Sequence, residues 1–223
     1  MLRVRGLAKS WPGGAPLFEA VDLDLAPGEL VAILGESGAG KSTLLNIIAG
    51  LDRADAGTVT VSDTVSGTEV TALSEDGLAL WRRKRVGFVF QAFHLLPYLT
   101  VEENVALPLL LNGVAAGERS ARARAALEAV GMAMHAARKP ASLSGGEMQR
   151  VAVARAVAHK PSLVLADEPT GNLDEANAAA TMQALRAAVK REGAAGLLVT
   201  HSAVAAASAD RVMRLAGRRL GPA

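Results

Sequence analysis

Residues 35–42 read Gly35-Glu36-Ser37-Gly38-Ala39-Gly40-Lys41-Ser42, and they match the pattern G-x-x-x-x-G-K-[ST] at every fixed position. The apolar run from Leu30 to Leu34 before them is typical of a strand buried on both faces, and Ser42 to Ala49 is typical of a helix. Between such elements, glycines allow successive backbone N–H groups to surround phosphate oxygens at the positive end of the helix. The stretch therefore predicts a loop that binds the phosphates of a nucleotide, with a chance glycine-rich turn as the alternative.

The side chains that end this stretch have distinct predicted roles. Lys41 is expected to reach the β- and γ-phosphates, and the hydroxyl of Ser42 is expected to bind the Mg²⁺ that bridges them. Thr43 follows in the first helical turn. The predicted phosphate-binding set is Gly35, Glu36, Ser37, Gly38, Ala39, Gly40, Lys41, Ser42 and Thr43.

Composition limits the class of protein. A chain of 223 residues suits one α/β domain, here expected over residues 1–223 with a helical insertion. Its 24 Lys and Arg are nearly balanced by 22 Asp and Glu, so nucleic acid is not a predicted partner. The sequence has no cysteine, which excludes disulfides and thiol chemistry. No run approaches the roughly 18 uninterrupted apolar residues of a membrane span, and no secretory leader is indicated.

The first part of the chain predicts an antiparallel β layer. Leu2 to Leu7 and Val21 to Leu25 alternate apolar and polar residues, as half-exposed strands do. Thr58 to Val61 is expected to add a strand, and Ser74 to Lys84 a helix capped by Ser74. That helix ends in the basic run 82–85, which is interpreted as a solvated helix end or, alternatively, as a contact with a membrane or partner.

The remainder predicts a mostly parallel sheet interrupted by a helical insertion at about 92–145. S/T-x-x-E capping boxes at Thr100 and Ser144 are each expected to open a helix, the second continuing to about Ala158. The other predicted elements are strands Val86 to Phe90, Leu163 to Ala166 and Leu197 to Thr200; helices Glu118 to Val130, ended by Gly131, and Glu175 to Glu192; further helix in the Ala-rich segments 121–137 and 203–209; and a closing hairpin from Arg211.

Polar residues follow three of the predicted parallel strands, and such strand ends gather at one edge of a sheet. Asp167 is expected to hold Mg²⁺, directly or through water, and Glu168 to act as general base on an attacking water. Gln91 is expected to reach Mg²⁺ or that water, and His201 to hydrogen-bond a γ-phosphate oxygen. The alternatives are an acidic loop boundary for the pair and ordinary surface positions for Gln91 and His201.

The stretch from Leu143 to Arg150 resembles the LSGGQ signature of ABC-transporter ATPases, in an LSGGE form, and the other motifs stand in that family's order. The resemblance implies the family's fold: a P-loop NTPase core with an antiparallel β subdomain and a helical insertion carrying the signature. It also implies that ATP is the nucleotide. Ser144, Gly145, Gly146 and Glu147 lie at a predicted helix N-terminus, which is a second anion site. Two such sites with one phosphate loop suggest a homodimer in which each signature closes on the other subunit's ATP.

Further residues are interpreted through the same resemblance. Trp11 stands where the family places a ring against adenine, with simple packing near the N-terminus as the alternative. Ser202 stands where the family usually has an Asp after the His at position 201. The contacts that this Asp makes in the family are therefore not expected in this chain, whereas the role of His201 is unaffected. Met148 stands where Arg or Gln is usual.

The motifs around Gln91 and Glu168 are similar to a branch that includes lipoprotein-releasing, macrolide-exporting and cell-division ATPases. This branch implies an ATP-hydrolysing motor, peripheral on the cytoplasmic face of the inner membrane. It would drive separate integral membrane permeases that handle lipoprotein, lipid or other hydrophobic cargo. The permease is expected to dock on the Gln91 loop and the segment 92–131. The alternatives are a non-transport ABC-type ATPase, for which the coiled-coil length and second phosphate loop are missing, and a GTPase or small-molecule kinase, which does not explain LSGGE.

Overall fold

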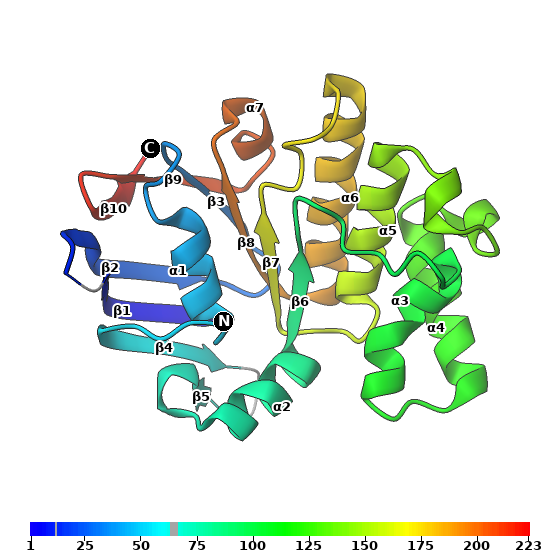
Figure 1. The fold of residues 1–223 in the computed structure, drawn as a ribbon, viewed down its shortest axis with the longest axis horizontal. Helices are drawn as coiled ribbons and strands as arrows, with labels where there is room; N and C mark the ends of the chain where they lie inside the picture. The colour runs from blue at the N-terminus through cyan, green and yellow to red at the C-terminus, as the bar shows by residue number, and fades with distance from the viewer. Residues whose placement is uncertain (12, 63–66) are drawn as a thin grey trace.

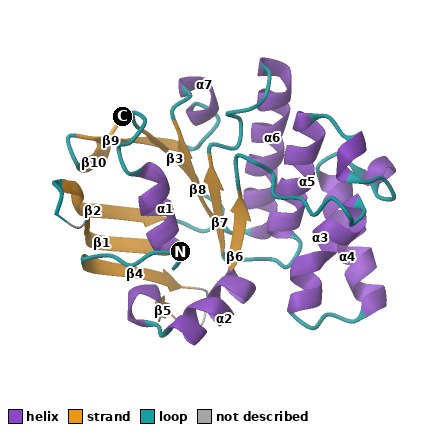
Figure 2. Ribbon diagram, in the orientation of Figure 1, coloured by secondary structure: helices purple, strands orange, loops and turns teal. Residues whose placement is uncertain are grey.

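The alternating N-terminal residues form an antiparallel sheet, as predicted (Figures 1 and 2). The computed structural model describes residues 1–11, 13–62 and 67–223. Its first sheet has the strand order β2-β1-β4-β5. The register of β1 shifts near Gly6, whose φ of 57° suits glycine. The strands are β1 (Leu2–Ser10), β2 (Pro16–Leu25), β4 (Ala56–Ser62) and β5 (Gly67–Glu69).

The apolar runs form a second, mostly parallel sheet. Its strand order is β10-β9-β3-β8-β7-β6, in which only the β9–β10 pair is antiparallel. The strands are β3 (Leu30–Leu34), β6 (Val86–Val89), β7 (Leu163–Asp167), β8 (Ala195–Thr200), β9 (Arg211–Ala216) and β10 (Arg219–Pro222). The carboxyl ends of β3, β6, β7 and β8 therefore share one edge, where the phosphate loop begins.

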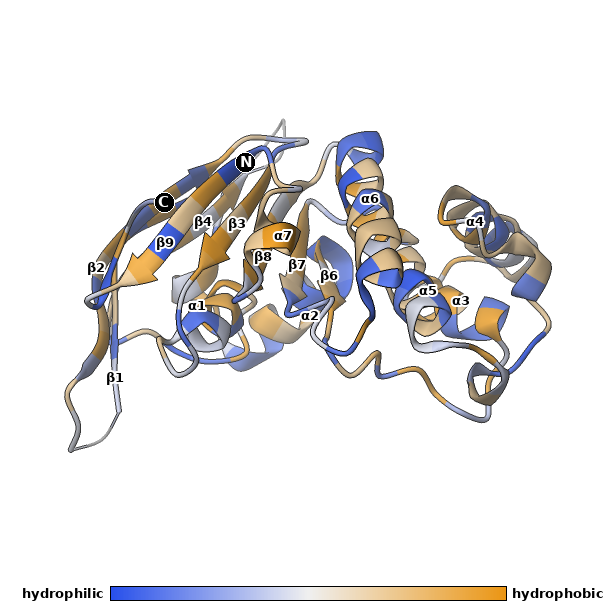
Figure 3. Ribbon diagram, turned by 90° about the horizontal axis from the view of Figure 1, so that it is seen from above, coloured by the Kyte–Doolittle hydropathy of each residue, from blue (hydrophilic) through white to orange (hydrophobic). Residues whose placement is uncertain are grey.

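Both faces of the parallel sheet are buried, and they belong to different parts of the core. On β3, Val31 and Ile33 pack with α1 (Lys41–Ile48) and the antiparallel sheet, whereas Leu30 and Ala32 pack with the helices on the other side. Figure 3 shows β3 and β8 as hydrophobic strands, while α6 presents both hydrophobic and hydrophilic residues. Burial on two faces explains why these strands read as continuous apolar runs rather than alternating ones.

Local capping signals locate several helices accurately. The boxes at Thr100 and Ser144 are both complete: each hydroxyl accepts from the third backbone N–H, and each glutamate returns to the cap. Ser74 caps its helix as predicted. The helices are α2 (Glu75–Arg85), α3 (Val101–Leu111), α4 (Ala116–Ala129), α5 (Gly145–Val157), α6 (Glu175–Glu192) and α7 (Ala203–Ala206).

The prediction of helix over the Ala-rich segment 121–137 was wrong in its second half. Helix α4 ends at Ala129 because Gly131 takes a left-handed φ of 71°, and the chain resumes only a 3₁₀ turn at Ala133–His135. Helices α3 and α4 lie to one side of the parallel sheet, beyond α5 (Figure 1). The division into one domain with an insertion at about 92–145 stays a prediction.

None of the helices in the described part of the chain is long and apolar enough to cross a membrane.

Candidate active site

The backbone of the phosphate loop takes a conformation that requires glycine at two positions. Gly38 and Gly40 have φ values of 79° and 92°, in the left-handed region that other residues avoid. At Gly40 a Cβ would also lie 2.6 Å from Cγ of Leu17. The loop then runs into α1, so that backbone N–H groups and the positive helix end are directed at the same place. This arrangement suits a polyphosphate anion.

The side chain of Lys41 folds back into the phosphate loop. Its Nζ donates to the carbonyl oxygens of Gly35 and Glu36, both at 2.9 Å, and its side chain is buried. The same Nζ lies 3.9 Å from Oε1 of Glu168. The ammonium group is thereby placed between the phosphate loop and the acidic end of β7.

Asp167 ends β7 and faces the first turn of α1. The hydroxyl of Ser42 donates to Oδ1 of Asp167 at 2.9 Å. Burial raises the pKa of the Asp167 carboxyl, and the neighbouring Glu168 charge adds to this, against the opposing effects of Ser42 and Lys41. The two oxygens are the hard ligands that Mg²⁺ prefers. A Mg²⁺ held by Ser42 and Asp167 would complete its shell with phosphate and water oxygens.

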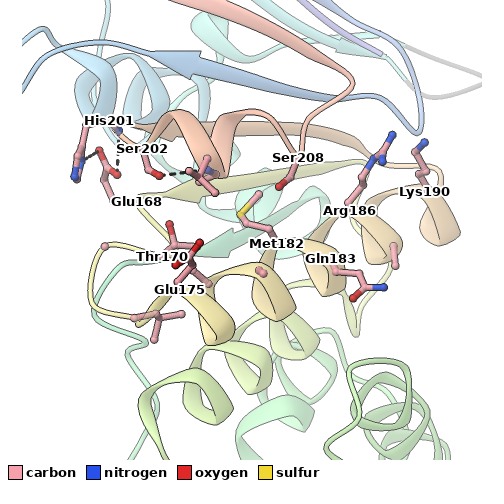
Figure 4. Close-up of a pocket in the computed structure, with 17 residues that line it drawn as sticks. Glu168, Thr170, Glu175, Met182, Gln183, Arg186, Lys190, His201, Ser202 and Ser208 are labelled. Carbon is pink, nitrogen blue, oxygen red and sulfur yellow. Dashed lines mark hydrogen bonds and ion pairs between the residues drawn. The ribbon is translucent and has the colours of Figure 1, made fainter.

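The side chain of Glu168, the next residue, contacts Thr200, His201 and Lys41 rather than Ser42. Its Oε2 accepts from the hydroxyl of Thr200 at 2.9 Å. Its Oε1 lies 2.9 Å from Nδ1 of His201 (Figure 4). The backbone of Glu168 has a φ of 45°, a left-handed conformation that costs a non-glycine residue energy. The two adjacent carboxylates therefore serve different surroundings, as their positions in the sequence predicted.

Most of the predicted site residues line one cavity of about 440 Å³. The walls of this cavity, called the nucleotide cavity below, include Leu17 from β2, the phosphate loop with the start of α1, and residues that follow β6, β7 and β8. Trp11 contributes an indole that is 54% exposed, so its face is available for contact with a planar base. The lining residues are Trp11, Leu17, Ser37, Gly38, Gly40, Lys41, Ser42, Thr43, Gln91, Glu168 and His201.

A larger cavity of about 790 Å³ lies beside it, between α6 and α7 (Figure 4). Its lining includes Glu168 and His201, which also line the nucleotide cavity, and apolar residues of α6 such as Met182. Ser202, where an Asp was expected, caps α7 by accepting from the N–H of Ala205. Ser202 therefore has a structural partner in this chain.

The signature residues lie apart from the nucleotide cavity of their own chain. None of Ser144, Gly145, Gly146 or Glu147 is among the residues that line it. The N–H of Ser144 donates to Oε2 of Glu147 at 2.7 Å, and this bond is the main reason why the pKa of Glu147 lies below its usual value. Gly146 packs so closely on α6 that a Cβ would meet Oδ1 of Asn177 at 2.1 Å. At the N-terminus of α5, Ser144 is therefore exposed, Gly145 and Glu147 are half-buried, and Gly146 is buried against α6.

Sequence reasoning gave no role to Thr200 and did not predict that Asn172 contacts Gln91. Thr200 is completely buried; besides its bond to Glu168, its hydroxyl accepts from the N–H of Ser202 at 3.0 Å. Asn172 accepts from Nε2 of Gln91 and donates to its backbone oxygen, both at 3.4 Å. A threonine that ends a buried apolar strand was a usable signal for the first. The stretch Gly171–Asp174, which resembles the loop that lines the dimer seam in this family, was a signal for the second.

A phosphate loop beside an Asp-Glu pair at a strand end is the arrangement of an enzyme that binds and hydrolyses a nucleoside triphosphate. The family model described as ABC transporter matches residues 18–171, and the chain belongs to this family as an ATP-binding, ATP-hydrolysing protein.

Curated relatives and solved structures agree with that assignment. The chain is 48% identical to the lipoprotein-releasing system ATP-binding protein LolD of Ruegeria pomeroyi, over 98% of this chain and 96% of the relative. It is 45% identical to LolD of Pseudomonas syringae pv. tomato, over 99% and 96%. The dimeric structure of MJ0796, a bacterial ABC transporter cassette, matches with a TM-score of 0.85 at 37% identity, over 99% of this chain and 96% of that one.

Proposed function

We propose that the chain is the peripheral motor subunit of a lipoprotein-releasing ABC transporter. In this proposal it works as a homodimer on the cytoplasmic face of the inner membrane and drives a separate integral permease, with lipid or another hydrophobic substance as the alternative cargo. The ATPase activity in this proposal rests on the placement of Glu168, which Thr200 and His201 fix at the edge of the nucleotide cavity. The names of the full-length relatives support the cargo class.

Each side chain has a separate task in the proposed mechanism. Backbone N–H groups of residues 35–42 and the ammonium of Lys41 hold the phosphates, and the exposed face of Trp11 stacks on adenine. Ser42, Asp167 and Gln91 would hold Mg²⁺, which would supply positive charge to the phosphate oxygens. Glu168 accepts a proton from the attacking water. His201 donates to a γ-phosphate oxygen and keeps the Glu168 carboxylate in place.

The second half of the proposed site comes from another copy of the chain. Ser144, Gly145 and Gly146 do not line their own nucleotide cavity, and the Ser144 hydroxyl and the backbone N–H groups at this helix N-terminus suit the γ-phosphate of a partner's ATP. Glu147 supports this helix end through its bond to the Ser144 N–H. The dimeric form of the similar cassette supports the same arrangement. ATP binding and dimer formation are then linked by mass action.

The proposed docking surface for the permease is the Gln91 loop with the helices that follow it. Leu96, Tyr98, Leu110 and Leu111 are exposed to between 48% and 86%, although they are large and apolar. Exposed apolar side chains of this kind favour a protein partner. The loop also carries Gln91, which lines the nucleotide cavity. Docking would therefore respond to the phosphate state of the site.

The decisive experiment replaces the proposed base. Glu168→Gln should keep ATP binding while hydrolysis falls by roughly 10²- to 10⁴-fold, about 3 to 5 kcal/mol of barrier, because the amide cannot take the proton. Glu175→Gln is the matched control, since Glu175 lines the neighbouring cavity at the start of α6 but not the nucleotide cavity. Wild-type turnover in Glu168→Gln would refute the assignment of the base.

The dimer is tested in the same Glu168→Gln background. ATP with Mg²⁺ should raise the dimer fraction measured by light scattering, and an added Ser144→Arg should abolish the rise. A dimer fraction that changes neither on addition of ATP nor on the Ser144→Arg substitution would contradict the two-copy site.

A further inference from the structure

Helix α5, whose first turn contains the signature, is bonded along its length to the loop that follows β6. Nε2 of the buried Gln149 donates to the carbonyl oxygen of Phe90 at 3.0 Å. The guanidinium of Arg155 donates to the carbonyl oxygens of Phe93 and His94, the first at 2.8 Å. These bonds enclose Gln91, so the loop that reaches the nucleotide cavity is attached to the signature helix of the same chain.

The segment of loop that Arg155 holds has a strained backbone. Phe93 and His94 have φ values of 58° and 49°, and two consecutive left-handed residues other than glycine are costly. Arg155 is half-buried, and its partners are neutral carbonyl oxygens; burial accordingly lowers the pKa of its guanidinium. A conformation of this kind persists only where its surroundings hold it, and charged donors to carbonyl oxygens are among the stronger bonds available.

The same loop also contacts the signature itself. A Cβ on Gly145 would lie 3.7 Å from Cζ of Phe93, so the Phe93 ring is placed against the first glycine of the signature. The same Cβ would lie 3.4 Å from Cδ2 of Leu173, which belongs to the loop before α6. A movement of the Gln91 loop that shifts Phe93 would therefore change the position of Gly145 or be resisted by it.

We infer that Arg155 is a positioning residue that couples the Gln91 loop at one ATP site to the signature that closes the other ATP site of the dimer. This inference rests on the proposed two-copy site. Gln91 lies at the nucleotide of its own chain, whereas the signature serves the partner's nucleotide. Arg155 joins them within one chain, so that occupancy of either site favours closure of the other, and the coupling is reciprocal.

The test uses the purified full-length protein and measures ATP hydrolysis against ATP concentration. The wild type should show a Hill coefficient clearly above one. Arg155→Met, which removes the donors but keeps a long side chain, should bring the coefficient to about one and weaken ATP-driven dimerisation about tenfold or more. Arg155→Lys, which keeps the charge but loses the fork of donors, should lie between them.

The matched control is Arg122→Met. Nη2 of Arg122 also donates to a backbone oxygen, that of Ala158 at 3.0 Å, yet it lies on α4 at the far end of α5 from the signature. This variant should keep the wild-type Hill coefficient. If Arg155→Met fails to melt cooperatively, Phe93→Leu replaces it: the loop carbonyl remains bonded, the ring contact with Gly145 is lost, and the Hill coefficient should fall.

The outcomes separate this inference from the proposed function. A wild type that dimerises with ATP but hydrolyses it without cooperativity would overturn the coupling and leave the two-copy site standing. The same holds for folded Arg155→Met and Phe93→Leu variants with an unchanged Hill coefficient. Failure of Glu168→Gln to dimerise with ATP at all would instead refute the two-copy site.

Discussion

Thr200→Val tests whether the buried hydroxyl beside Glu168 positions that carboxylate. The substitution keeps the shape of the side chain and removes only its polar atom. Thr200 is completely buried, and its hydroxyl donates to Oε2 of Glu168 while accepting from the N–H of Ser202. Both groups lose a partner in the variant, and solvent does not replace it at a fully buried position.

The size of the effect follows from these two bonds. A hydrogen bond to a charged group contributes about 1.5 to 3 kcal/mol, and a buried N–H left unpaired costs about 1 to 3 kcal/mol. The added methyl group gains some apolar burial, so we expect the free energy of unfolding to fall by about 2 to 3 kcal/mol. Without the Thr200 bond, Glu168 keeps its contacts with His201 and Lys41 but is less firmly positioned, so hydrolysis should fall about 10- to 100-fold, equivalent to roughly 1.4 to 2.7 kcal/mol of barrier.

The measurements are urea unfolding, phosphate release and ATP binding, with Thr181→Val as the matched control. Thr181 is also completely buried, but its hydroxyl has no hydrogen-bond partner among the described residues. Its replacement should leave stability equal or higher and hydrolysis unchanged. If Thr200→Val is no less stable than Thr181→Val and hydrolyses ATP at the wild-type rate, the positioning role of Thr200 is wrong.

Four further predictions concern the loop, the acids and the docking surface. Gly40→Ala should weaken ATP binding at least about tenfold in a titration, because φ is 92° and Leu17 would have to move; unchanged affinity would contradict this. Asp167→Asn should raise the melting temperature without nucleotide at neutral pH, because burial raises the wild-type pKa and ionisation is then costly. That gain should fade below about pH 4, where the wild-type carboxyl is protonated, and a lower melting temperature would refute it. The pKa of Asp210 is lowered to about 2, mainly by the Leu30 N–H and Arg186, so its contribution is present above about pH 4 and is lost as pH falls toward 2. Asp210→Asn should therefore cost about 1 kcal/mol at pH 7, after allowance for its partial exposure, and progressively less in acid unfolding series; a difference independent of pH would count against it. Tyr98→Glu should reduce membrane association and permease-stimulated hydrolysis while ATP binding and melting stay normal, because Tyr98 is 86% exposed; normal membrane binding would place the docking surface elsewhere.

Features that depend on neighbouring residues were predictable from the sequence. Helix α6 begins and ends where its apolar spacing placed it, at Glu175 and Glu192, and the capping boxes at Thr100 and Ser144 are both formed. The parallel strands followed from apolar runs buried on two faces. The convergence of Lys41, Gln91 and Glu168 on one cavity followed from the rule that parallel strands end at a common edge.

The tertiary structure alone decided the contacts that hold those groups. Thr200 meets Glu168, Asn172 meets Gln91, and Arg155 meets Phe93, in each case across a stretch of chain far longer than any local signal spans.

The physical reason for this division is the range of the interactions. Capping, apolar period and loop glycines act over three or four residues, and a sequence displays them directly. A hydrogen bond between distant side chains depends on how sheets and helices pack, because packing alone brings one particular donor within about 3 Å of one particular acceptor. The chemistry of the loop was therefore determined by the sequence, and the positioning of the base by the fold.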